Sequence, residues 1–271
     1  MRVPVLEANG ALAVGRFGWK NQHASLLSFS SDAYLNEMGI SNRLPPNNVD
    51  VTRLCDVVSD PNDNTPDSEG LEDVDHFARF MRATKMPPRD KALAASSDGV
   101  ARASLFHSVG CDFCHVSSIT TAPAGTAVAA GAFIVPDSLG NKIIHPYSDF
   151  LLHNIGTGDG IVQTGGQETA NKMRTPPLWG VRTRTELLHD GRSATFFDAI
   201  QRHGGEAQPV TNKFQPLEYH PAKPTHHFPA LALAGQQKRR GAQAPRWTFT
   251  SHTCRFVTAV ALCENAFNED P

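Results

Sequence analysis

The stretch LFHSVGCDFCH, residues 105–115, contains two cysteines separated by two residues, with a histidine directly after the second. This C-x-x-C-H spacing is typical of covalent c-type haem attachment, in which each thiol adds to one vinyl group of the porphyrin. We therefore expect Cys111 and Cys114 to be the attachment points for one covalently bound haem c. The imidazole of His115 is the expected axial ligand of its iron.

Other uses of paired cysteines fit this stretch less well. Zinc ordinarily needs four protein ligands at paired spacings, and no second C-x-x-C or C-x-x-H follows within reach. A thioredoxin-like dithiol belongs in a βαβ setting, which this neighbourhood lacks. Elsewhere in the chain, Cys254 and Cys263 could form a disulfide in an oxidising compartment, which would leave Cys55 unpaired.

The segment 171–207 offers further side chains for a haem. Met173 is a candidate second axial ligand that would raise the reduction potential, whereas an open sixth position would leave the iron free to bind peroxide. Packing in the core is the alternative interpretation of this methionine. Arg174, Arg182 and Arg192 are candidates to pair with the haem propionates, because a guanidinium group matches a carboxylate, and a solvated surface position is the alternative for each. The same segment also contains Lys172, His189 and His203.

The composition excludes several classes of protein. The 271 residues include 25 Lys and Arg against 27 Asp and Glu, which gives a formal net charge of −2. This balance lacks the excess positive charge that nucleic-acid binding requires. No uninterrupted apolar run reaches the roughly 18 to 20 residues of a membrane span. Glu7 and Asn9 interrupt the region where a signal peptide would need an apolar core, so we expect a chain that stays inside or is partial.

The expected fold class is mainly α, with a cytochrome-c-like helical haem domain and long irregular loops. Nineteen Pro and 21 Gly are spread along the chain, and such residues break it into short helices joined by loops. We expect a partial N-terminal segment of short helices and loops at residues 1–86 and the haem domain at 87–215. An atypical, poorly ordered tail, rich in Pro and His, is expected at 216–271.

Local patterns predict three helices. In LEDVDHFARFMRAT, residues 71–84, apolar side chains recur at threes and fours and acidic residues gather at the N-terminal end. A second helix is expected from about Asp98 to just before Gly110, and a third begins at Thr195. The polar and acidic stretch 46–70 is expected to be a surface excursion or linker.

Four stretches between about residues 15 and 207 resemble the bacterial di-haem cytochrome c peroxidase superfamily, in its di-haem oxidoreductase, thiol-oxidoreductase-like branch. They are GRFGWKNQ with NEMGIS, LFHSVGCDFCH, HPYSDFLLHNIGTGDG and MRTPPLWGVRTRTELLHDGRSATFFDAIQRHGGEA. The resemblance implies a periplasmic, mostly helical protein with two cytochrome-c-like domains that face each other across a pair of haems.

The chain departs from this family pattern in three ways. It contains one C-x-x-C-H site instead of two, and that site resembles the second, C-terminal haem domain. Arg102 occupies a position where relatives have a small glycine, which implies a looser crossing of the first and last helices. The chain also continues into a Pro- and His-rich tail where relatives have an amphipathic helix, so a missing closing helix is expected.

The expected function is electron transfer through the single haem, in a redox protein related to di-haem peroxidases. Peroxide reduction takes two electrons, and one haem iron that cycles between ferric and ferrous states stores one, so activity as a peroxidase is left open. The expected partner is a redox protein, either a small cytochrome or a second haem domain. Haem c is attached after export, which implies a periplasmic location. The alternative is a haemless, truncated structural or binding derivative of such an enzyme.

Overall fold

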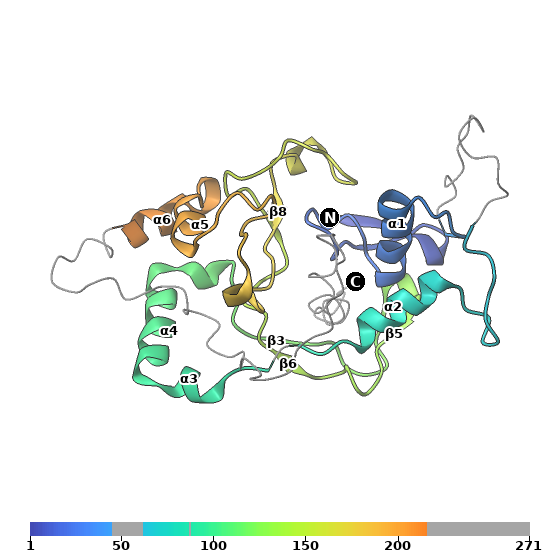
Figure 1. Ribbon diagram of the computed structural model, residues 1–271, viewed down its shortest axis with the longest axis horizontal. Helices are drawn as coiled ribbons and strands as arrows, with labels where there is room; N and C mark the ends of the chain where they lie inside the picture. Colours follow the sequence, from blue (N-terminus) through green and yellow to red (C-terminus); the bar gives the residue numbers. More distant parts are fainter. Residues whose placement is uncertain (45–61, 87, 216–271) are drawn as a thin grey trace. The chain divides into compact units, whose positions relative to one another are not determined.

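The computed structural model describes residues 1–44, 62–86 and 88–215. These residues form short helices, two-stranded ribbons and long loops, as expected for a helical protein with little sheet (Figure 1). None of the helices within these ranges has the length and hydropathy of a membrane span. The poorly ordered tail expected after residue 215 lies outside the described residues.

The described residues divide into two compact units. Residues 1–44, 62–85 and 120–143 belong to the first unit, and residues 86, 88–119 and 144–215 belong to the second. The elements of the first unit are β1 (Arg2–Val5), η1 (Leu6–Ala8), β2 (Ala11–Val14), α1 (Leu26–Met38), α2 (Asp73–Ala83), β4 (Ala127–Val128), η3 (Ala129–Gly131) and β5 (Phe133–Ile134). The short strands β3 (Ile119–Thr120) and β6 (Ile143–Ile144) lie where the chain passes from one unit to the other.

The first unit begins with an antiparallel hairpin that our sequence expectations did not include. Its strands β1 and β2 pair with Val3 opposite Ala13. The connection contains Asn9 and Gly10, both with positive φ, a pair that favours tight hairpin turns. Alternation of residue types on either side of this Asn-Gly pair is the sequence pattern that could have predicted the hairpin. The inward side chains, with Ala24 and Ala129, form a buried apolar cluster.

The helices α1 and α2 pack against each other in the same unit. The predicted helix at 71–84 is observed as α2, and its positions Val74, Ala78 and Met81 are buried. Phe77 remains 50% exposed, and its ring packs edge-on against Tyr34 of α1 with centroids 5.2 Å apart. The three-four spacing therefore predicted the buried face of α2 correctly at its centre.

The elements of the second unit surround the C-x-x-C-H stretch. They are α3 (Lys91–Ala95), α4 (Ser97–Val109), η2 (Cys111–Phe113), β7 (Leu152–His153), η4 (Gln167–Thr169), β8 (Met173–Arg174), η5 (Val181–Thr183), α5 (Phe196–Gln201), η6 (Gly205–Ala207) and α6 (Gln208–Phe214). The helix expected from Asp98 is observed as α4, which begins one residue earlier. The helix expected from Thr195 is observed as α5, whose first turn is capped by the Thr195 hydroxyl.

A closing helix is present, so the expectation that it is missing was wrong. The helix α6 contacts α4, and a Cβ placed on Gly110, directly after α4, would lie 3.6 Å from Val210 of α6. Val210 and Phe214 are four residues apart and share one face of α6, and Phe214 is fully buried. At seven residues the helix is too short to show a sustained period in the sequence.

Asp63, in the polar stretch 46–70, binds the first turn of α2. Its carboxylate is buried and accepts hydrogen bonds from the backbone amides of Asp73, at 3.2 Å, and Val74, at 3.0 Å. These are amides of the first turn of α2, which have no partner within the helix. The carboxylate therefore stabilises the start of α2 from outside the helix.

We expect Asp63→Ala to lower the free energy of unfolding by about 1.5–3 kcal/mol, the usual range for buried hydrogen bonds to a charged group. Urea titration followed by circular dichroism measures this loss in the full chain. The matched control is Asp137→Ala, which removes an exposed carboxylate from the same unit. Equal urea midpoints for the two variants would show that Asp63 contributes nothing to α2.

Candidate haem site

The C-x-x-C-H stretch forms a tight turn at the end of α4. The helix ends at Gly110, whose φ of 98° lies in the left-handed region. A Cβ at this position would lie 2.9 Å from the Phe113 ring, so glycine alone suits the turn. Beyond it, the amide of His115 donates to the carbonyl of Cys111 at 3.0 Å. Cys111 and Cys114 are both free thiols.

His115 is oriented by a carbonyl from a distant part of the same unit. Its Nδ1–H donates to the backbone oxygen of Tyr147 at 2.9 Å, since a carbonyl oxygen can only accept. This bond leaves Nε2 as the nitrogen with a free lone pair, the state that an iron ligand requires. Burial lowers the pKa of His115 to about 4. The imidazole is therefore neutral at pH 7.

The backbone after Tyr147 is bonded directly to the C-x-x-C-H turn. The amide of Asp149 donates to the carbonyl of Cys114 at 2.8 Å, and the amide of Ser148 donates to the carbonyl of Val116 at 3.0 Å. Residues 147–149 thus run along residues 114–116 and hold the acceptor of His115 in place. Burial raises the pKa of the Cys111 thiol to about 11, which keeps this sulfur protonated.

A third segment, residues 175–179, fixes the loop that carries Tyr147. The indole nitrogen of Trp179 donates to the carbonyl of His145 at 2.6 Å. Thr175, in the same segment, accepts through its carbonyl a hydrogen bond from the Ser148 hydroxyl, also at 2.6 Å. The sequence MRTPPLWG, within the longest of the resembling stretches, therefore acts on His115 through an intermediate loop.

His153 occupies the centre of a polar network beside Cys114. One ring nitrogen lies 2.8 Å from Asp149 Oδ2 and the other lies 3.0 Å from Glu206 Oε2. The ring is also within hydrogen-bonding reach of the Cys114 sulfur. The bonds to Asp149, Cys114 and Glu206 raise the pKa of His153 to about 11, so the ring is an imidazolium at neutral pH. Burial favours the neutral acid of Asp149, but hydrogen bonds led by that from His153 lower its pKa.

Backbone bonds lock the two ends of this network together. The carbonyl of Asn154 accepts from the amide of Glu206 at 2.8 Å, and the Asn154 amide donates to Glu206 Oε1 at 2.9 Å. The amide of Gly204 donates to the carbonyl of Ile155, also at 2.8 Å. The strings LLHNIG and HGGEA, about fifty residues apart in the sequence, therefore form one contact.

Met173 and Arg174 lie in β8, which pairs with β7 so that Met173 is opposite His153. Both side chains are buried, each with 5% exposure. Cross-strand partners share a face, so Met173 lies on the same face of the ribbon as His153. The guanidinium carbon of Arg174 lies 5.9 Å from the centre of the Phe150 ring. Arg192 is more exposed and forms an ion pair with Asp190.

The remaining candidates of segment 171–207 differ in their surroundings. His203 donates from Nδ1 to the carbonyl of Ala199 at 2.7 Å, and burial lowers its pKa. Its Nε2 has no hydrogen-bond partner among the residues that the structure describes. Lys172, Arg182 and His189 are partly buried. The Nε atom of Arg182 is buried and has no hydrogen-bond partner among the described residues.

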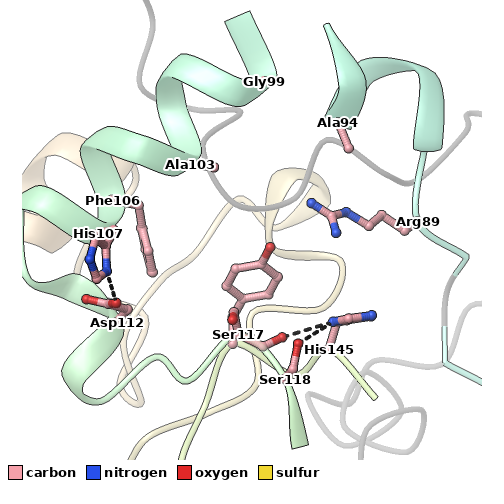
Figure 2. Close-up of a pocket in the computed structure, with 11 residues that line it drawn as sticks. Arg89, Ala94, Gly99, Ala103, Phe106, His107, Asp112, Ser117, Ser118 and His145 are labelled. Atoms are coloured by element: carbon pink, nitrogen blue, oxygen red, sulfur yellow. Dashed lines mark hydrogen bonds and ion pairs between the residues drawn. The ribbon is translucent and has the colours of Figure 1, made fainter. Parts of the chain in front are cut away.

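A cavity of about 330 Å³ lies beside the C-x-x-C-H turn (Figure 2). One wall consists of Gly99, Ala103 and Phe106, which follow one face of α4. Figure 2 shows Arg89 pointing inward and His145 bonded to Ser118, at 2.9 Å. Tyr147 also lines the cavity, but Cys111, Cys114 and His115 do not.

Asp149, His153 and Glu206 are the site residues that our sequence expectations missed. In HPYSDFLLHNIG, Asp149 and His153 are four residues apart, a spacing that makes two side chains neighbours on a helix but predicts no contact in a loop such as this one. Glu206 follows 53 residues after His153 and is joined to it by the fold alone. No pattern in the sequence connects Glu206 with the other two residues.

The residues present fit a c-type haem. Both attachment sulfurs are thiols, and the imidazole beside them is neutral and held through Nδ1 so that Nε2 is available. In metal sites this second hydrogen bond of a histidine ligand fixes its tautomer and orientation. The carbonyl of Tyr147 supplies that bond here.

We expect His153→Gln to flatten the dependence of stability on pH between pH 6 and 9. The raised pKa of His153 means that its stabilisation is complete below about 6.5, the ordinary pKa, and is lost as the pH rises toward 11. Urea titration of the haem-free chain at several pH values measures this, with the wild type as the reference because it shares every other titrating group. A wild-type slope that survives in the variant would contradict the imidazolium assignment.

Comparison with known proteins gave one family. The family model described as "Di-haem oxidoreductase, putative peroxidase" matches residues 7–224. Neither the curated proteins nor the solved structures gave a significant match. The matched range includes the C-x-x-C-H turn, the loop that holds His115 and the His153 network. The chain therefore belongs to the di-haem oxidoreductase family.

Proposed function

We propose that the chain carries one haem c, attached through Cys111 and Cys114 and ligated by His115, and that it transfers electrons. The observation that carries this proposal is the hydrogen bond from His115 Nδ1 to the carbonyl of Tyr147, directly after two free thiols. It fixes the tautomer and orientation of the imidazole that leave Nε2 available to a metal. Membership of a haem-binding oxidoreductase family supports the same chemistry.

The residues around the C-x-x-C-H turn each contribute to this proposed function. When bound, haem supplies one-electron exchange between the ferric and ferrous states of its iron. The Tyr147 carbonyl holds the imidazole of His115, and burial of that ring disfavours the proton that would compete for Nε2. Gly110 permits the reversal that brings the thiols and the imidazole to one place.

We assign the remaining haem contacts to Met173, Arg174 and Arg192. Met173 is the proposed second axial ligand, supported by its burial and by its place opposite His153, whose ring reaches the sulfur of Cys114. Arg174 provides a buried guanidinium for a propionate. Arg192 already pairs with Asp190, so a propionate would have to share or replace that partner.

A relay role agrees with the number of attachment sites. The 271 residues contain one C-x-x-C-H stretch, and reduction of peroxide requires two electrons, whereas one iron that cycles between ferric and ferrous states stores one. We propose that a second redox centre, in a small cytochrome or another haem domain, completes the electron pathway. A periplasmic location is part of the proposal, since haem c is attached after export.

Serine variants test the covalent attachment. We expect the full chain, produced with a cytochrome maturation system, to keep its haem on a denaturing gel. Cys111→Ser and Cys114→Ser should each leave a single thioether, which moves the absorption of the pyridine haemochrome to longer wavelength. Cys55→Ser, which removes a thiol outside the motif, is the control and should behave as the wild type. Colourless wild-type protein would overturn the proposal.

Addition of hydrogen peroxide with a reduced electron donor tests the relay role. The haem-loaded chain should not turn over peroxide alone, because it lacks a second store of electrons. Its ferrous haem should instead be oxidised by a second redox protein in stopped-flow absorption measurements. Sustained peroxide turnover by the isolated chain would contradict the relay assignment and favour a peroxidase.

A further inference from the structure

A cluster of three metal-ligating side chains lies next to the haem attachment turn. The sulfur of Cys114, a carboxylate oxygen of Asp149 and a ring nitrogen of His153 all lie within 4.8 Å of one another. All three residues are partly buried and belong to the second unit. Thiolate, imidazole and carboxylate are the ligands that Zn²⁺ takes in proteins.

Glu206 fixes the ring of His153 in the manner of an outer-sphere ligand. The carboxylate accepts from His153 Nδ1–H at 3.0 Å, which leaves Nε2 as the nitrogen 2.8 Å from Asp149 Oδ2. A carboxylate on the far nitrogen is the usual arrangement behind a histidine that binds metal. A cation in place of the Nε2 proton would keep the bond from His153 Nδ1 to Glu206, while Nε2 and Asp149 Oδ2 would move apart by a few tenths of an ångström to take the ion between them.

The donor atoms are held by the backbone before any ion arrives. The amide of Asp149 is bonded to the carbonyl of Cys114 at 2.8 Å, which fixes the two ligands relative to each other. The amide of Leu151 donates to Asp149 Oδ1 at 2.9 Å and leaves Oδ2 directed at His153. The bonds between Asn154 and Glu206 fix the outer carboxylate.

We propose that the haem-free chain binds a divalent transition-metal ion of the Zn²⁺ class through Cys114 Sγ, Asp149 Oδ2 and His153 Nε2. The ion takes the place of the Cys114 thiol proton and the His153 Nε2 proton, both of which pass to solvent, and nothing is oxidised or reduced. Three protein ligands leave a fourth, tetrahedral position for water.

This site goes beyond the proposed function, because it belongs to the chain before haem attachment. A thioether sulfur is neutral and cannot supply the anionic ligand that the cluster offers through Cys114. Metal binding and attachment of haem at Cys114 therefore exclude each other. Cys111 is outside the cluster and is unaffected.

Titration of the full-length, reduced, haem-free chain with Co²⁺ tests the site. We expect one ion per chain, a thiolate-to-cobalt charge-transfer band in the near ultraviolet, and displacement of that ion by Zn²⁺. Cys114→Ser should remove the band, and Glu206→Gln should weaken binding by about 10- to 100-fold, the usual effect of losing an outer-sphere partner. Cys111→Ser is the matched control and should bind as the wild type.

Alkylation followed by mass spectrometry gives a readout that does not depend on a variant folding. Bound Zn²⁺ should protect Cys114 of the wild-type chain from alkylation and leave Cys111 at its metal-free rate. Absence of the cobalt band from the wild type, retention of it in Cys114→Ser, or equal protection of both cysteines would each overturn the proposal. None of these results depends on whether haem attaches, so the two proposals fail separately.

Discussion

The hydrogen bond from His115 Nδ1 to the carbonyl of Tyr147 is the interaction on which the site depends. A histidine can present Nε2 to a metal in a fixed direction only if its other nitrogen is held. Here a backbone oxygen does this, and it is 32 residues away in the sequence. The surrounding structure therefore has to hold the carbonyl oxygen of Tyr147 in place.

Among the described residues, loops hold this carbonyl in place, without a layer of sheet or packed helices. Residues 147–149 are bonded to residues 114–116, while Thr175 and Trp179 hold the same loop from its other side. Each contact satisfies a backbone group that would otherwise be unpaired in a partly buried loop. Hydrogen bonds of this kind let long loops hold a site in place where there is little sheet.

The sequence predicted those parts of the fold that depend on neighbours along the chain. The helices α2, α4 and α5 follow from apolar spacing and end signals within about fifteen residues, and the C-x-x-C-H turn follows from its own letters. The closing helix α6 was missed because seven residues cannot show a period, although Phe214 is fully buried. The partnership of Asp149, His153 and Glu206 was inaccessible, because 53 residues separate the last two and only the fold joins them.

His115 and His153 lie in the same unit, but their surroundings shift their pKa values in opposite directions. Burial lowers the pKa of His115 to about 4, while the bonds to Asp149, Cys114 and Glu206 raise that of His153 to about 11. At neutral pH the first ring offers a lone pair and the second carries a proton. An electrophile that arrives at this site therefore meets one nitrogen ready to bind, whereas the other must first give up its proton. On the two proposals above, haem iron takes His115 and a divalent cation takes His153, and both require the sulfur of Cys114.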